Sequence, residues 1–424
     1  MYYMLLKKLL ALSLVICFAY LGHGQPDQKE NVIFLENEAS IISINSITDN
    51  LEITCGSVSF KDCAAACYWK KGKAHILDSA LPGKNTQSGD VVVSSVLNGS
   101  VGNIFVGTRT LKSGRTQGFV YHSVSKKTLF LPKMNSAAFC ITNHGYSTKI
   151  YGTLKEKKHH YLCIWELFKE YDKKYNPQGY KIELYTKIDL PDLDKDDKVN
   201  TVDALEVTDP NSYYANSRYI LFNVKNKDDI HPYCAQHHTI SDYNEDSSVF
   251  QIEPSRITGK DDHRIIKYNC MRYVKGSLPH LLVGGSINSA GGRWCLSLRM
   301  AVYTSDNPIP YGKNEQSDDF LKYDRENKYQ WVGICWFSDQ WKVLCGCFKD
   351  QAQIWIQVQK KKPLVALDVQ GILKPYMLDK NIKFHVVRKL DPSLKKMFVQ
   401  GVDSAEKKIA FVISLDKSIM EYGK

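Results

Sequence analysis

Residues 331–358 read WVGICWFSDQWKVLCGCFKDQAQIWIQV and hold four of the chain's seven tryptophans and three of its twelve cysteines. Three apolar stretches, 331–337, 341–348 and 354–358, are separated by the polar breaks SDQ and KDQAQ. Aromatic and β-branched residues of this kind favour strands. The segment therefore predicts a three-stranded antiparallel meander whose tryptophans and cysteines fill a core. The alternative is that its aromatic side chains form an exposed ligand platform.

Similar short stretches recur along the whole chain. GNIFVGTRT, QGFVYHSV and TLFLP predict a second meander, and SRYILFNV, RWCLSLRMAVY and KKIAFVISL belong to later ones. Each is bounded by turn residues, which is typical of strands. Sustained helical periodicity is nearly absent. Two short pieces, KDCAAACYWKKG at 61–72 and WELFKEYDKK at 165–174, are compatible with either helix or strand.

Successive meanders in a chain of this length need an architecture that hides their edges. A β-propeller does so by repeating sheets around an axis. The sequence predicts an all-β fold, a disulfide-stapled β-propeller of about six four-stranded blades, forming a single domain over residues 25–424. Tandem β-sandwich domains are the alternative. No WD, kelch or other blade motif recurs, so the prediction depends on the strands alone.

The first 25 residues, MYYMLLKKLLALSLVICFAYLGHGQ, have the layout of a signal peptide. Lys7 and Lys8 precede an apolar run over 9–21, and Gly22 and Gly24 lie before Gln25. Residues 1–24 are therefore expected to be removed, and the product to be secreted, extracellular and without stable membrane insertion. An uncleaved anchor is the alternative. Asn98, in the acceptor sequence Asn-Gly-Ser, is the expected glycosylation site of a glycoprotein.

Eleven cysteines remain once Cys17 is removed with the signal peptide. In an oxidising compartment most are expected to form disulfide bonds. Because the number is odd, one thiol is expected to be free and buried or to link to a partner chain. Zinc is the rival interpretation for the pairs 63/67 and 345/347, but neither spacing matches the usual zinc arrangement.

The formal charge of +11 falls to +9 when the signal peptide is removed. The basic residues are scattered or mixed with acidic ones, as in KEKKHH and KDDK. A nucleic-acid surface would need a basic stripe interleaved with aromatic residues. No nucleic-acid partner is therefore expected.

An acidic segment, DLDKDDKVNTVD at 192–203, has the spacing of a calcium loop. Its ligand positions one, three, five, nine and twelve are Asp192, Asp194, Asp196, Asn200 and Asp203. It resembles the EF-hand loop and the shorter calcium hairpins of integrin-type propellers. Asp197 departs from the glycine of the EF-hand turn, and Asp203 departs from its bidentate glutamate. Calcium is thus the one cofactor predicted, with a solvated acidic loop as the alternative.

Local catalytic signatures are missing: there is no GxSxG, HExxH, P-loop or GxGxxG motif. HPYCAQHH at 231–238 is compatible with a metal site or with surface histidines beside a disulfide. SINSAGGRW at 286–294 resembles the Asp-box turn of sialidase propellers, with Asn288 in place of aspartate and one extra residue before Trp294. Sialidase chemistry would also need an arginine cluster and a Tyr–Glu pair. The spacing does not group the candidate arginines Arg109, Arg115, Arg256, Arg272 and Arg293.

Two classes of function remain. The first is a secreted binding protein that recognises an extracellular protein or glycan through loops at one face of a propeller. The alternative is a glycoside hydrolase, sialidase-like, on the same scaffold, with acid and base residues contributed by separate blades. The missing catalytic signatures favour binding over enzymatic activity.

Overall fold

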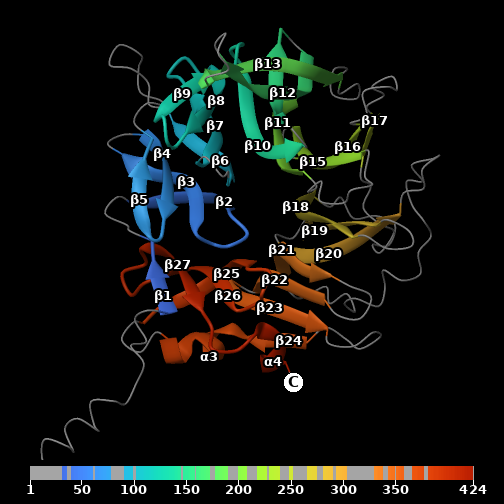
Figure 1. Cartoon of the computed structure of the whole chain (residues 1–424). Coiled ribbons are helices and arrows are strands. Elements are labelled where there is room, and N and C mark those ends of the chain that lie inside the picture. Colours follow the sequence, from blue (N-terminus) through green and yellow to red (C-terminus); the bar gives the residue numbers. More distant parts are fainter. Residues whose placement is uncertain are drawn as a thin grey trace, which may run out of the picture.

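The chain forms a ring of antiparallel sheets, seen along its axis in Figure 1. The computed structural model describes residues 31–35, 40–60, 63–77, 90–98, 102–144, 147–157, 159–171, 177–189, 199–207, 217–226, 229–238, 248–251, 265–274, 280–289, 293–302, 329–337, 342–348, 350–357, 365–376 and 381–423. Within these ranges there are seven sheets, of which six have four strands and one has three. The fold is therefore an all-β propeller.

The first three sheets follow one another along the chain. The first contains β2 (Ile41–Ile47), β3 (Ile53–Phe60), β4 (Cys63–Lys70) and β5 (Lys73–Ile76). The second contains β6 (Val91–Leu97), β7 (Ile104–Thr110), β8 (Thr116–His122) and β9 (Lys127–Phe130). The third contains β10 (Ser136–His144), β11 (Ser147–Glu156), β12 (His159–Tyr171) and β13 (Pro177–Asp189).

The next three sheets continue the ring. The fourth contains β14 (Val199–Val207), β15 (Ser217–Asn226), β16 (Asp229–His238) and β17 (Ser248–Gln251). The fifth contains β18 (Ile265–Val274), β19 (His280–Ser289) and β20 (Arg293–Val302). The sixth contains β21 (Tyr329–Phe337), β22 (Lys342–Phe348), β23 (Gln351–Gln357) and β24 (Val365–Asp368).

The seventh sheet joins the two ends of the described chain. It contains β25 (Lys383–Leu390), β26 (Lys396–Val402), β27 (Lys408–Ser414) and, beside β27, the chain's first strand β1 (Val32–Phe34). Val32 pairs with Ile413 in the antiparallel register of these two strands. Three short helices lie close to this sheet and the sixth: α3 (Val369–Leu373), η4 (Lys374–Tyr376) and α4 (Ile419–Tyr422).

The sequence predicts about six blades, and the structure has seven sheets. A prediction of six divides the chain into blades of equal length, whereas the sheets differ in length and the first strand belongs to the last sheet. The ring excludes tandem β-sandwiches. The helical alternative for 61–72 and 165–174 is wrong, because residues 63–70 form β4 and residues 165–171 form the last part of β12.

The meander predicted over 331–358 is confirmed. β21, β22 and β23 are consecutive antiparallel strands, and Cys345 pairs with Gly333 on one side and Ile354 on the other. Cys345, Ile354 and Trp355 are buried, and Cys345 and Ile354 pack in the core between the sixth and seventh sheets. For these side chains the stretch is core rather than a ligand platform.

Apolar side chains fill the spaces between neighbouring sheets. Trp69 of β4 packs in one cluster with Phe398 of β26, between the first and seventh sheets. Phe105 and Phe119 of the second sheet pack against residues of the first. Large aromatic side chains contribute much of the buried area in such a core.

A structural feature recurs around the ring although no sequence motif does. In each sheet one strand has a bulge or irregularity where it pairs with the next strand of the chain. These strands are β2, β6, β10, β14, β18, β21 and β25. In four sheets a glycine of the second strand lies against the first strand, and a Cβ on it would lie 1.9 to 2.2 Å from a backbone oxygen: Gly56, Gly107, Gly152 and Gly401. Only glycine permits this approach. Gly285 and Gly346 occupy the equivalent register positions in the fifth and sixth sheets.

The disulfide staple is not shown. Cys55, Cys67 and Cys163 are buried free thiols, which is more than the single one expected from an odd count. Cys55 pairs in register with Tyr68, and Cys67 with Gly56, so these two cysteines of neighbouring strands point to opposite faces of the first sheet. Burial raises the pKa of Cys55 strongly and that of Cys67 to about 12, so both stay protonated.

Within the described ranges, no helix has the length and apolar character needed to cross a membrane.

Candidate functional site

The two ends of the ring differ in the chain segments that they carry. The first strand of each sheet starts at the end where the chain arrives from the preceding sheet, which we call the connection end. It then turns at the opposite end, the turn end, into the second strand. Asp90 and Thr110 of the second sheet, joined by a backbone hydrogen bond of 2.7 Å, lie at the connection end, and Asn98 lies at the turn end.

A group of charged side chains, the Lys133–Glu156–Lys187 cluster, lies at the connection end between the second and third sheets. Lys133 belongs to the turn between β9 and β10, Glu156 ends β11, and Lys187 lies near the end of β13. The Glu156 carboxylate accepts a hydrogen bond from Lys133 through Oε1 and from Lys187 through Oε2, the latter at 2.6 Å. The Lys133 side chain is 54% exposed and that of Glu156 is 31% exposed, so solvent reaches the cluster.

The two lysines dominate the electrostatics of this cluster. Hydrogen bonds from Lys133 and Lys187 lower the pKa of Glu156 to about 2, and the bond to Glu156 raises the pKa of Lys187. The Lys187 ammonium also lies 4.7 Å from the centroid of the Tyr161 ring, a cation–π contact. Because one carboxylate is shared by two ammonium groups, the cluster keeps an excess of positive charge.

The turn that carries Lys133 is fixed to both sheets. Asn135 adopts a positive φ of 59°, and its N–H donates to the Thr116 oxygen at 2.7 Å while its oxygen accepts from the Lys155 N–H at 2.9 Å. Ser136 Oγ donates to the Lys133 oxygen at 2.6 Å and accepts from the Gly118 N–H at 3.2 Å. The backbone of the turn that carries Lys133 is therefore held in place.

Arg109 lies at the same end, on the face of the second sheet that meets the first. Its Nη2 donates to Gln117 Oε1 at 2.6 Å, and its Cζ lies 3.7 Å from the centroid of the Phe130 ring. Its Nε is buried without a hydrogen-bond partner, and burial lowers the pKa of the guanidinium. Gln117 in turn donates to the Leu131 oxygen at 3.0 Å, which holds the pair in place.

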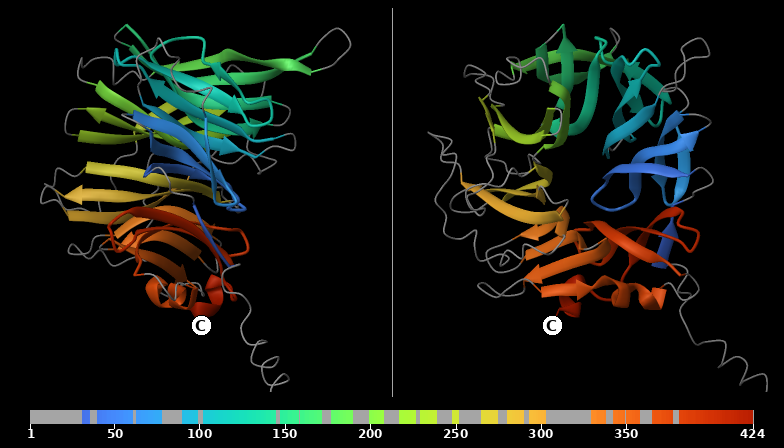
Figure 2. Two further views of the ribbon diagram at one scale, coloured as in Figure 1. Left: turned by 90° about the vertical axis from the view of Figure 1, so that its left-hand side faces the viewer. Right: turned by 180° about the vertical axis from the view of Figure 1, so that it is seen from behind.

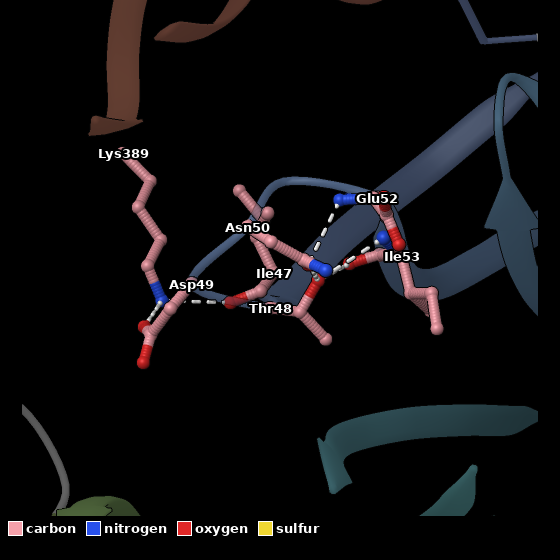
Figure 3. Close-up of polar contacts among 7 residues, drawn as sticks. All are labelled: Ile47, Thr48, Asp49, Asn50, Glu52, Ile53 and Lys389. Carbon is pink, nitrogen blue, oxygen red and sulfur yellow. Dashed lines mark hydrogen bonds and ion pairs between the residues drawn. The ribbon is translucent and has the colours of Figure 1, made fainter. Parts of the chain in front are cut away.

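The turn end carries a different set of contacts, where the seventh sheet meets the first (Figure 3). Lys389 of β25 reaches the turn between β2 and β3, where Nζ lies 2.7 Å from Asp49 Oδ1 and donates to the Ile47 oxygen at 2.8 Å. Thr48 Oγ1 donates to Asn50 Oδ1 at 2.7 Å, which closes the turn on itself. These contacts join the seventh sheet to the first.

The predicted calcium ligands are only partly within the described residues. Asp192, Asp194 and Asp196 lie outside them. Asn200 and Asp203 lie on β14, where Asp203 pairs in register with Asn223 of β15. In the part of the chain that the structure describes, no group of three metal-binding side chains is found. The calcium site stays a prediction.

The other predicted features fall at separate places. HPYCAQHH lies on β16, and SINSAGGRW spans the hairpin of β19 and β20, in which Asn288 pairs with Trp294. Arg109 lies on β7 and Arg115 in the turn between β7 and β8, Arg272 and Arg293 lie in the fifth sheet, and Arg256 lies outside the described residues. Asn98, the predicted glycosylation site, is exposed.

Sequence reasoning did not group the three residues of the cluster. Glu156 lies in the run KEKKHH, which by itself indicates scattered charge, and Lys133 and Lys187 are 54 positions apart. The strand register brings Glu156 and Lys187 together, since Leu154 pairs with Tyr161, which pairs with Asp189, and the turn before β10 adds Lys133. No local signal predicts this.

The described residues form a propeller of seven sheets, with a positively charged cluster at its connection end. No protein-family model and no curated protein sequence matches the chain. Among solved structures it is similar to a chain from a study of two prolyl endopeptidases, with 8% identity, a TM-score of 0.44, and coverage of 94% of this chain and 51% of that one. The chain thus spans about half the length of that protein.

Two further solved structures are similar over most of the ring. One is a subtype N10 neuraminidase-like protein of a little yellow-shouldered bat isolate, with 8% identity, a TM-score of 0.34, and coverage of 76% of this chain and 94% of that one. The other is fructan 1-exohydrolase IIa from Cichorium intybus, with 10% identity, a TM-score of 0.29, and coverage of 91% and 86%.

Proposed function

We propose that the protein is a secreted, extracellular binding protein that recognises a protein or glycan ligand at the connection end of the ring. The observation that carries the proposal is the Lys133–Glu156–Lys187 cluster, which is solvent-accessible, preorganised and positively charged. A ligand with an acidic group, such as a carboxylated sugar or an acidic peptide, fits this chemistry best.

The cluster can bind an acidic group without a change in backbone. Lys133 and Lys187 each have three donors, of which Glu156 takes only one from each. A ligand carboxylate can therefore share both ammonium groups with Glu156 and form charge-assisted hydrogen bonds. The bonds that fix the Lys133 turn reduce the entropy lost on binding.

The competing hydrolase hypothesis requires a carboxyl group that is protonated near neutral pH, so that it can act as general acid. Glu156 is the carboxyl group of the cluster, and its pKa is lowered to about 2 rather than raised. It stays ionised at any physiological pH. The electrostatics of this cluster therefore argue against Glu156 as the general acid of a glycosidase.

Secretion and glycosylation are part of the proposal. Protein recovered from culture medium is expected to begin at Gln25 and to carry a glycan at Asn98. Because Asn98 is exposed at the turn end, this glycan would leave the connection end uncovered. N-terminal sequencing that starts at Met1 would contradict this expectation.

A glycan array combined with a panel of glycosidase substrates tests the function. The wild type is compared with Lys133→Ala/Lys187→Ala and with a matched control, Lys127→Ala/Lys395→Ala, which removes two exposed lysines at the turn end. Binding of acidic ligands is expected to be lost in the first variant and retained in the control. Equal binding by both variants would contradict the cluster, and substrate turnover by the wild type would support the hydrolase.

A further inference from the structure

The third sheet has the longest outermost strand among the described residues. β13 has 13 residues, whereas β20 of the fifth sheet has 10 and the outermost strands β1, β5, β9, β17 and β24 have three or four. In the described part of the chain, β13 pairs only with β12, so its outer edge offers a long row of backbone donors and acceptors. Natural proteins usually keep edge strands short because such a row pairs readily with another strand.

β12 and β13 also extend past the rest of their sheet. β11 pairs with β12 as far as Leu167, and beyond it only the two strands continue, from the pair Phe168–Lys181 to Tyr171–Pro177. Figure 2 (left) shows this hairpin, in green, reaching beyond the body of the ring. Phe168 at its base is 39% exposed. The outer edge of β13 therefore lies at the outside of the ring, where a second molecule can approach it.

Residues 180–184 of this edge read YKIEL, with apolar and charged side chains alternating. Tyr180, Ile182 and Leu184 lie on the face that packs against the core between the second and third sheets. Lys181 and Glu183 lie on the other face, where they form an ion pair and are 56% and 49% exposed. Lys181 and Glu183, which carry opposite charges, lie one position on either side of Ile182.

We propose that β13 is a homodimer interface, in which two copies of this chain pair their β13 edges antiparallel about a two-fold axis at Ile182. Lys181 of each copy then lies opposite Glu183 of the other, and Tyr180 lies opposite Leu184. Opposite charges at directly opposing positions stabilise paired strands. The contact is isologous, as in most homodimers, and it joins two four-stranded sheets into one.

Charge disfavours the two nearest registers of the same kind. An axis at residue 181 places two lysines opposite each other, and an axis at 183 places two glutamates opposite each other. An axis between residues places apolar side chains opposite charged ones. The pairing also has natural limits, because Pro177 has no N–H to donate and the strand is irregular at Tyr185, where the register with β12 shifts. A second copy is therefore a better fit than an unrelated extended peptide.

The proposed interface is independent of the ligand site. It involves residues 180–184 of β13, whereas Lys187 of the cluster lies on the same strand beyond the irregularity at Tyr185. Dimerisation and ligand binding can therefore fail separately. The dimer would also be non-covalent, since 180–184 contains no cysteine.

Sedimentation analysis of the full mature protein, over a range of concentrations and with reductant present, tests the proposal. The wild type is expected to dimerise. Lys181→Glu alone and Glu183→Lys alone each place like charges opposite each other and are expected to weaken dimerisation at least about tenfold. Both side chains are well exposed, so the variants are expected to fold.

Two combinations make the outcome specific to this register. The double variant Lys181→Glu/Glu183→Lys restores opposite charges and is expected to dimerise like the wild type. An equimolar mixture of the two single variants is expected to form heterodimers. A wild type that stays monomeric would overturn the proposal and leave the edge open to a strand from another protein. A dimer that no charge variant affects would also overturn it, because it would form through another surface.

Discussion

Lys389 forms an ion pair with Asp49, so that a residue near the end of the sequence fastens a turn near its start; the two charged atoms are 2.7 Å apart. The neighbouring Arg388 makes the same junction from a more enclosed position. Its Nη2 donates to the Ile44 oxygen at 2.8 Å and its Nε to Gln400 Oε1 at 2.7 Å, and burial lowers its pKa. Side chains thus join β25 of the seventh sheet to β2 of the first, in addition to the pairing of β1 with β27.

These two contacts are expected to differ in energy. The Asp49 side chain is 75% exposed, so Asp49→Asn is expected to lower the free energy of unfolding by less than about 1 kcal/mol, the range of surface ion pairs. Arg388→Met leaves two acceptors without their charged donor and is expected to cost about 1.5 to 3 kcal/mol. Urea unfolding of both variants measures this. Equal effects would show that the enclosed arginine contributes no more than the exposed pair.

The close approach at Gly152 gives a second prediction. A Cβ there would lie 1.9 Å from the backbone oxygen of Ala137, so Gly152→Ala forces two paired strands apart. We expect the free energy of unfolding to fall by about 1 to 3 kcal/mol. Gly114→Asn is the control, because its surroundings are open and asparagine tolerates the positive φ of 77°. Thermal unfolding that separates the two variants confirms the constraint.

The Glu156 carboxyl gives a prediction about pH. Its folded-state pKa of about 2 lies below the ordinary value of about 4.3. The stabilisation from its two lysine partners is therefore present above about pH 4.3 and is lost as the pH falls through about 2. A carboxyl titration by NMR is expected to show the low midpoint in the wild type. In Lys133→Ala/Lys187→Ala the midpoint is expected to return toward the ordinary value, and no such return would contradict the assigned cause.

Trp355 tests the role of the segment at 331–358. It is 2% exposed, so Trp355→Ala is expected to cost about 3 to 5 kcal/mol and to lower the yield of secreted protein. Val365→Ala, at a position that is 47% exposed, is the control and is expected to change little. Normal yield of the tryptophan variant together with lost ligand binding would instead indicate an exposed platform.

The predicted calcium loop is tested by melting curves. If Asp192, Asp194, Asp196, Asn200 and Asp203 bind calcium, an excess of about a hundredfold over the dissociation constant stabilises the native state by about 2.7 kcal/mol. The melting temperature is then expected to rise between chelator and calcium. Asp194→Asn/Asp196→Asn is expected to remove the rise. Identical curves for the wild type with and without calcium would reduce the segment to a solvated loop.

The propeller could be predicted from sequence because strand patterns are local. The meander at 331–358 shows this: its apolar runs and polar breaks are visible without knowledge of its neighbours. The number of sheets could not be predicted in the same way. The glycines that mark the bulges are separated by irregular distances, 45 positions between Gly107 and Gly152 and 61 between Gly285 and Gly346, so no period is visible.

The charged cluster could not be predicted for a different reason. Lys133, Glu156 and Lys187 belong to three separate elements, and each by itself is an ordinary surface residue. What brings them together is the register of the third sheet and the fixed turn before it. Registers are set by packing across whole strands, and the sequence near any one of these residues carries no sign of the others.

The pairing of β1 with β27 has a consequence for the order of synthesis. A ribosome makes β1 before the other described strands, and the pair Val32–Ile413 can form only after β27 has been made. The first six sheets can assemble as they emerge, while β1 still lacks its partner strand β27. Contacts between such distant residues form slowly. Closure of the ring is therefore expected to be the last event of folding, and until then the chain has to keep the unpaired strand β1 from pairing with other chains.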